Sequence, residues 1–224
     1  MGEKLLLNIP MKTILCFFIL MSSLTTVCGQ PALEKVVGKY FRVNPLDRPL
    51  NVFLNQVIKD TAFSITTLQK RTDTSLFYLR GIYKNFSPFT FRTQLVQFII
   101  ADYLLVDDST NQPVDTLISF RLTATTMPEA GKEQYNQVQN EYRVFNRKYR
   151  KSFMLNDEKT QLATDNKTII GQLNDFYIFK PFYIPYFSVS WGNVLGKENY
   201  AFSIEMNLKI EDGELMLPIP PDRF

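Results

Sequence analysis

The chain has 224 residues, with 25 Lys and Arg against 22 Asp and Glu, so its net charge is +3. This near balance gives no reason to expect a nucleic acid or another polyanion as a partner. Histidine is absent and only two cysteines occur, which removes the commonest general base and the commonest transition-metal ligand. Histidine-dependent catalytic sites and ordinary zinc sites are therefore excluded, and we expect neither a metal nor a cofactor.

The first 29 residues read as a secretory signal peptide. Lys12 supplies a positive start, residues 13–21 form an apolar core, and small or polar residues lead to Gly29. We predict cleavage between Gly29 and Gln30. The apolar core is shorter than the roughly 20 residues that a membrane span needs, so a retained transmembrane anchor is the weaker alternative.

Both cysteines, Cys16 and Cys28, lie in this segment. Exported eukaryotic proteins more often carry disulfides, and a chain of about 195 residues can form a core without them. We therefore expect an exported protein of the bacterial envelope, periplasmic or extracellular, from a Gram-negative bacterium. A lipoprotein anchored at Cys28 is the alternative, although residues 25–27 do not match the usual sequence before a lipidated cysteine.

Between residues 30 and 74, apolar residues recur at helical spacing in two places, 33–40 and 50–58. The second place predicts an amphipathic helix that packs on a sheet. A strand is the alternative there, because two of its residues are β-branched.

Three consecutive strands are predicted between residues 75 and 126. Residues 75–85 and 93–106 are largely apolar on both faces, which is typical of strands covered on both sides. Residues 116–125 alternate between apolar and polar, which leaves one face wet. Gly81 predicts a bulge or a close backbone approach. The short connections favour an antiparallel meander.

Residues 128–153 predict one long amphipathic helix packed on the sheet. Pro128 suits the first helical position. The apolar stripe consists of Tyr135, Val138, Tyr142, Phe145 and Tyr149. The basic residues of the last turns are Arg143, Arg147, Lys148, Arg150 and Lys151. We interpret them as a solvated face that complements the helix dipole, with an anion-binding or membrane-surface patch as the alternative.

Residues 155–174 are polar and predict a long loop. Residues 176–191 are rich in aromatic side chains, and two prolines interrupt them, which favours an edge strand or an extended crossing segment. We interpret the rings mainly as core residues. The alternative is a ligand-binding or partner-binding platform that includes Tyr183, Tyr186 and Trp191.

The strict alternation of residues 200–210 predicts a strand whose polar side chains point outward. Asp212-Gly213 predicts a tight hairpin turn into a short strand at residues 215–217. The expected fold is therefore a single α+β domain over residues 30–224, in which a mainly antiparallel sheet packs against the long helix.

The sequence contains no phosphate-binding glycine loop, metal cluster or nucleophile motif. We therefore expect a non-catalytic binding or structural module of the cell envelope that acts through protein–protein contacts. The alternative is a small carbohydrate-binding or carbohydrate-active protein that uses the aromatic stretch 176–191 together with a carboxylate pair. The expected membrane contact is the signal peptide or, in the alternative, a lipidated Cys28.

Overall fold

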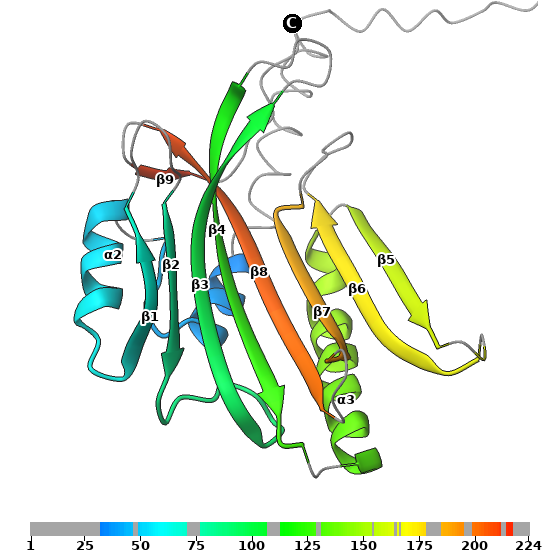
Figure 1. Cartoon of the computed structure of the whole chain (residues 1–224). Helices are drawn as coiled ribbons and strands as arrows, with labels where there is room; N and C mark the ends of the chain where they lie inside the picture. Colours follow the sequence, from blue (N-terminus) through cyan, green and yellow to red (C-terminus); the bar gives the residue numbers. More distant parts are fainter. Residues whose placement is uncertain are drawn as a thin grey trace, which may run out of the picture.

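The computed structural model describes residues 32–46, 49–70, 77–106, 113–128, 131–153, 155–163, 165, 167–177, 185–194, 199–211 and 214–216. Within these ranges, nine strands form one sheet, and helices accompany it (Figure 1). The expected sheet-dominated α+β fold is confirmed. The predicted signal peptide, with Cys28, Gly29 and Gln30, lies outside the described residues. None of the described helices combines the length and apolarity that crossing a membrane requires.

The sheet follows the order β1-β2-β3-β4-β8-β7-β6-β5, and β9 pairs with β8 beside this path. The strands are β1 (Phe63–Gln69), β2 (Tyr78–Tyr83), β3 (Thr93–Val106), β4 (Pro113–Thr126), β5 (Leu155–Leu162), β6 (Ile169–Tyr177), β7 (Phe187–Asn193), β8 (Tyr200–Glu211) and β9 (Glu214–Met216). The predicted antiparallel meander is present as β2, β3 and β4, and β1 extends it. Glu211 pairs with Glu214, so the predicted C-terminal hairpin is also confirmed.

Strand β8 lies in the middle of the sheet, although it comes near the end of the chain. It pairs with β4 on one side and with β7 on the other, antiparallel in both cases. It therefore joins the meander β1–β4 to a second meander formed by β5, β6 and β7. The alternation of residues 200–210 predicts this strand, but alternation does not indicate which strands are its neighbours.

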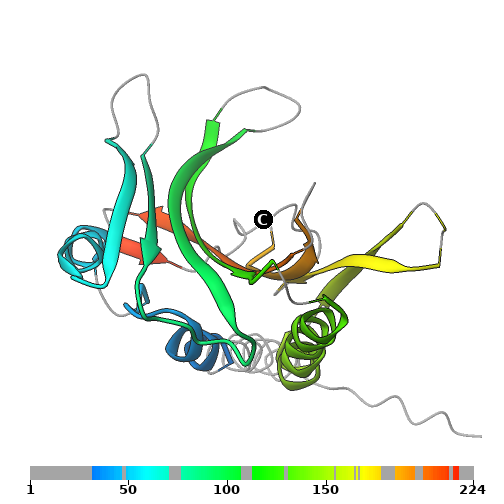
Figure 2. The same cartoon turned by 60° about the horizontal axis from the view of Figure 1, so that its bottom comes forward.

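Three helices accompany the sheet within the described residues: residues 32–40, α2 (Leu50–Lys59) and α3 (Gly131–Tyr149), which continues into the 3-10 helix η1 (Arg150–Ser152). The amphipathic helix predicted at residues 50–58 is confirmed as α2, and residues 33–40, whose apolar residues have helical spacing, also lie in a helix. Figure 2 shows the helix of residues 32–40 and α3 on one side of the curved sheet. The prediction of one long helix is therefore right only in part. The helix is shorter than 128–153 and begins at Gly131, whose φ is +45°.

The core lies between the sheet and these helices. The predicted apolar stripe of α3 contributes Val138, Tyr142, Phe145 and Tyr149, all of which are buried. The Phe145 ring stacks on Phe187 of β7, with ring centroids 5.3 Å apart. The Phe53 ring of α2 meets Phe120 of β4 edge-on at 5.2 Å. Aromatic pairs of this kind add to the stabilisation from burial itself.

The predicted loop at residues 155–174 is wrong, because these residues form β5 and most of β6. The turn between the two strands is held by Asp165, whose carboxylate accepts hydrogen bonds from the Thr168 hydroxyl at 2.6 Å and from its backbone N–H at 2.8 Å. The hydroxyl and backbone donors lower the pKa of Asp165 to about 2. Strand β5 reads as polar because it is an edge strand, where charged side chains discourage pairing with another chain.

The predicted edge strand within residues 176–191 is also wrong. Strand β7 lies inside the sheet, between β6 and β8. Its amides can pair on both sides because Pro185 precedes the strand instead of interrupting it. Pro181 lies outside the described residues.

Strands β2 and β3 bury one face only, contrary to the prediction that both faces are covered. Leu79 and Phe98 are buried, whereas on the opposite face Arg80 is exposed and Leu95 is only partly buried. The close approach predicted at Gly81 is confirmed, because a Cβ there would overlap the ring of Phe63.

Candidate ligand-binding face

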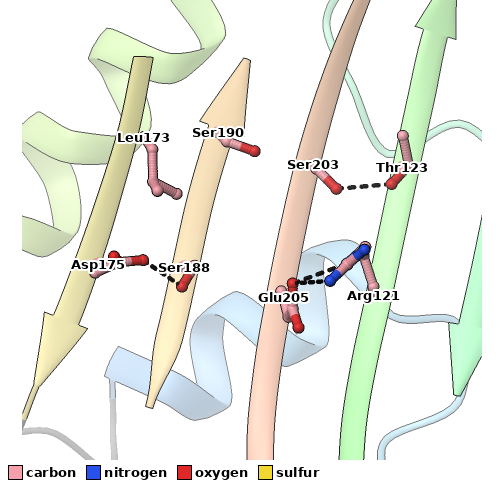
Figure 3. A pocket seen from close by; sticks show the side chains of 8 residues that line it. All are labelled: Arg121, Thr123, Leu173, Asp175, Ser188, Ser190, Ser203 and Glu205. Carbon is pink, nitrogen blue, oxygen red and sulfur yellow. Dashed lines mark hydrogen bonds and ion pairs between the residues drawn. The ribbon is translucent and has the colours of Figure 1, made fainter. Parts of the chain in front are cut away.

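The sheet face that points away from α3 carries polar side chains where β4, β8, β7 and β6 lie next to one another. Side chains along a strand alternate between faces, so the residues between core positions point to this side. They line a depression of about 380 Å³ (Figure 3). We call this surface the polar face, and its residues are Arg121, Thr123, Leu173, Asp175, Ser188, Ser190, Ser203 and Glu205.

Strand register places four of these residues in one row across the sheet. Asp175 pairs with Ser188, Ser188 with Glu205, and Glu205 with Arg121. Neighbouring strands lie about 4.8 Å apart, so the row extends over roughly 14 Å. The Ser188 hydroxyl donates to Oδ1 of Asp175 at 2.6 Å, and Nε of Arg121 donates to Oε2 of Glu205 at 2.8 Å (Figure 3).

The next row along the strands consists of Leu173, Ser190, Ser203 and Thr123. The hydroxyls of Thr123 and Ser203 lie 2.7 Å apart and share a hydrogen bond. Ser190 stands between Leu173 and Ser203, and among the described residues its hydroxyl has no hydrogen-bond partner. The Ser190 hydroxyl is therefore available to a bound molecule.

The charges of the polar face are held by several contacts each. Glu205 pairs with Nη2 of Arg121 at 2.7 Å and also accepts from the Ser119 hydroxyl at 2.7 Å. Asp175 is 7% exposed. It lies directly opposite Asp157 of β5, and like charges in that position repel one another.

Lys159 of β5 offsets this repulsion. Its Nζ lies 3.2 Å from Asp157 and 3.8 Å from Asp175. The hydrogen bond to Asp157 and the two negative charges raise the pKa of the Lys159 amine. Lys159 therefore places a positive charge between the two carboxylates at the β5 side of the polar face.

A second hollow, of about 300 Å³, adjoins the depression on the side of β5 and β6 and shares Leu173 and Ser190 with it. Gly171 and Gly192 pair with each other beside Ser190, so the backbone is uncovered there. A Cβ on Gly171 would lie 3.1 Å from the carbonyl oxygen of Trp191, tighter than ordinary contact. Because these two residues have no side chain, nothing projects above the backbone at this part of the polar face.

The polar face carries the donors and acceptors of a binding surface for a polar molecule. No family model matches the chain. Neither a curated protein nor a solved structure matches it. Among the described residues, no three metal-ligating side chains are grouped so that they could hold a metal ion.

The aromatic residues predicted as a possible platform are placed differently. Trp191 and Tyr186 are 3% and 4% exposed, and Tyr183 lies outside the described residues. The Trp191 Nε1–H donates to the Gln172 side-chain oxygen at 3.0 Å, and the indole meets the Tyr135 ring of α3 edge-on at 5.3 Å. Burial raises the pKa of the Tyr186 hydroxyl. These contacts favour the core interpretation of Trp191 and Tyr186.

The polar face has no signature of its own in the sequence. The alternation in residues 116–125 and 200–210 indicates that Arg121 and Glu205 point away from the core. However, alternation says nothing about which strands are neighbours, and the β4–β8 and β7–β8 pairings are what bring these residues together.

Proposed function

We propose that this protein is an exported, non-catalytic binding module of the bacterial cell envelope, and that a partner protein binds at its polar face. The observation that carries the proposal is the continuous polar surface on the sheet side opposite α3. That surface combines charged and hydroxyl groups with a depression that α3 leaves uncovered.

The chemistry of the polar face suits recognition of polar groups. Asp175 can accept from a cationic or amide donor of the partner, while Ser190 can donate to a carbonyl oxygen. The contacts of Asp175 with Ser188 and of Glu205 with Arg121 fix these groups before binding. Preorganised groups lose less conformational freedom on binding, which favours affinity.

Export is supported by the layout of the N-terminal segment and by the absence of cysteine after Cys28. Sequencing the N-terminus of the protein from the cell envelope tests this part. A chain that starts at Gln30 would support it, and a lipid on Cys28 would favour the lipoprotein alternative. A cytoplasmic protein that retains the segment before Gly29 would contradict export.

Partner binding is tested by filling the depression. Ser190→Trp places a large ring among the hydroxyls of the polar face, and Asn136→Trp adds the same ring at an exposed position of α3. Affinity capture from envelope extracts of the source organism, read by mass spectrometry, should recover a partner with the wild type and with Asn136→Trp. The Ser190→Trp protein should lose that partner. Recovery of the same amount of partner by both variants would contradict binding at the polar face.

A second candidate is glycan binding at the same face. The observation in its favour is that two carboxylates, Asp175 and Glu205, line one depression together with four hydroxyl side chains. No aromatic side chain lines that depression, so the stacking surface on which a sugar ring would rest is missing there. Titration with envelope oligosaccharides, followed by calorimetry, separates the two: saturable binding that Ser190→Trp abolishes would favour the glycan.

A further inference from the structure

The C-terminal half of α3 and the following η1 carry a cluster of exposed cations on the other side of the molecule. We call it the basic patch, and its residues are Arg143, Arg147, Lys148, Arg150 and Lys151. The sequence from Arg143 to Phe153 contains no acidic residue. At 1.5 Å per residue the patch is roughly 12 Å long, so five positive charges share little more than two helical turns.

The side chains around the basic patch do not neutralise it. Among the described residues, ion pairs are formed by Lys39, Arg42, Arg121 and Lys159 but by no residue of the patch. Within the patch, Lys148 lies over the Tyr149 ring at 5.1 Å, and Arg150 donates to the neutral amide of Asn156 at 3.3 Å.

Two acidic side chains lie near the patch, on α3 itself and on β5. Glu141 is buried and is paired with Lys39. Glu158 of β5 accepts a hydrogen bond from the Tyr142 hydroxyl at 3.0 Å. Neither forms an ion pair with Arg143, the first residue of the patch.

The helix dipole accounts for only part of the basic patch. Its effect is confined to the last turn of a helix, where Arg147 and Lys148 lie. Arg150 and Lys151 lie in the 3-10 turn η1 that continues α3, whereas Arg143 precedes the last turn of α3. The helix dipole therefore favours the cations at the C-terminal end but does not account for Arg143, nor for five positive charges without an acidic residue among them.

We propose that the basic patch docks the protein on an anionic lipid surface. Clusters of four to eight Lys and Arg on an amphipathic helix are attracted to anionic head groups, and this attraction requires no pocket. The basic patch lines neither of the two hollows described above, and an anionic lipid surface, unlike a shaped ligand, needs none. Val144, 45% exposed, is the sole large apolar side chain exposed between Arg143 and Lys151.

This inference goes beyond the proposed function and is compatible with it. Figure 2 shows α3 on one side of the sheet, and the polar face points to the other side. Contact of the basic patch with lipid therefore leaves the polar face open to its partner. The lipid contact is also separate from the one that the signal peptide or a lipidated Cys28 would provide.

The test is sedimentation of the exported protein with vesicles of phosphatidylcholine alone or mixed with phosphatidylglycerol. The wild type should bind the mixed vesicles and should dissociate from them as the salt concentration rises. It should not bind vesicles of pure phosphatidylcholine. Arg143→Glu/Arg147→Glu should weaken binding by about 25-fold or more, since each cation contributes about fivefold. Lys35→Glu/Lys59→Glu changes the net charge equally at exposed positions elsewhere and should bind nearly as the wild type does.

Should Arg143→Glu/Arg147→Glu fail to fold, as judged by thermal unfolding, Lys148→Glu/Lys151→Glu serves the same purpose. Equal weakening in the Lys35→Glu/Lys59→Glu control would show that net charge acts, not the patch, and would overturn the proposal. Binding to pure phosphatidylcholine, or no binding to mixed vesicles, would also overturn it. So would full competition by inorganic phosphate, which would assign the patch to free phosphate. Patch-dependent capture of an acidic protein without vesicle binding would assign it to a protein partner instead.

Discussion

The hydroxyl of Tyr40 donates a 2.8 Å hydrogen bond to Oε1 of Glu141, 101 residues further along the chain. Lys39 Nζ reaches the same oxygen at 2.8 Å, and Thr90 donates to Oε2 through its hydroxyl and its backbone N–H. One buried carboxylate thereby ties the helix of residues 32–40 and the segment before β3 to α3. Burial raises the pKa of Glu141, but the hydrogen bonds from Lys39, Thr90 and Tyr40 outweigh it and leave that pKa below its ordinary value.

Replacing this carboxylate should destabilise the fold strongly. Glu141→Leu leaves Tyr40, Lys39 and Thr90 without their acceptor, and we expect a loss of about 3 kcal/mol in the free energy of unfolding. Urea denaturation measures the loss. Glu133→Leu removes an exposed carboxylate of the same helix and should change stability by no more than about 0.5 kcal/mol. Similar urea midpoints for the two variants would show that the Glu141 contacts do not hold the helices.

The lowered pKa of Glu141 also predicts a pH dependence. A carboxyl group whose pKa is lower in the folded state stabilises the protein fully above its ordinary pKa. This contribution is lost as pH falls from the ordinary value of 4.5 through the lower folded value. The stability advantage of the wild type over Glu141→Gln should therefore shrink on acidification below pH 4.5. An advantage that stays constant across that range, in urea titrations at several pH values, would contradict the ionised carboxylate.

Alanine substitution at two glycines should change the stability of the protein in opposite directions. At Gly81 a new Cβ would overlap the Phe63 ring, so Gly81→Ala should cost about 1–3 kcal/mol. Gly38 is exposed in the first helix with nothing near its Cβ position, so Gly38→Ala should stabilise by up to about 1 kcal/mol. Thermal unfolding distinguishes them. Gly81→Ala combined with Phe63→Leu should recover part of the loss, and no recovery would mean that the overlap is not the cause.

The buried indole of Trp191 predicts a spectroscopic result. Trp191 is the single tryptophan of the chain, so its fluorescence reports on one site. It should emit at short wavelength and should not shift when a partner is added. Trp191→Ala should cost about 3–5 kcal/mol, because it empties the space between Gln172 and Tyr135. Long-wavelength emission from the folded protein, or a stable Trp191→Ala variant that no longer binds its partner, would favour the alternative in which Trp191 belongs to a binding platform.

The stripe of α3 predicts unequal effects of two matched substitutions. Tyr142 is 1% exposed and donates to Glu158, so Tyr142→Asp both empties a core position and places a charge near another carboxylate. We expect a loss of about 3 kcal/mol or more. Arg147→Asp, on the exposed face, should stay near 0.5 kcal/mol. Equal shifts in the urea midpoint would mean that α3 buries a different face.

Strands with one wet face could be predicted closely from the sequence, and so could the stripe of α3. Residues 116–125 and 200–210 alternate because burial on one side selects for it, and the observed strands β4 and β8 cover them with one or a few extra residues. Strand β5 was missed because Asp157 and Lys159 belong to an edge strand that is mostly exposed. Strand β7 lies inside the sheet against expectation, because Pro185 precedes the strand and does not interrupt it.

The polar face could not be predicted in the same way. Asp175 and Glu205 are 30 positions apart in the printed sequence, and they become neighbours across Ser188 only because β7 pairs with both β6 and β8. The row is therefore a product of strand order, which a single sequence does not encode in any local pattern. The same holds for Glu141, whose acidic side chain reads as an exposed helix position until Lys39 and Tyr40 are placed beside it.

The central position of β8 has a consequence for the order of assembly. Strands β4 and β7 both pair with β8, which follows every other strand except β9 in the chain. A nascent chain that ends before Tyr200 presents two half-sheets, each with an open edge where β8 belongs, and the core residues of β8 are missing from both. The native sheet is therefore completed only once residues 200–211 are available to pair with both β4 and β7. Until then the two unpaired strand edges remain open to pairing with other chains.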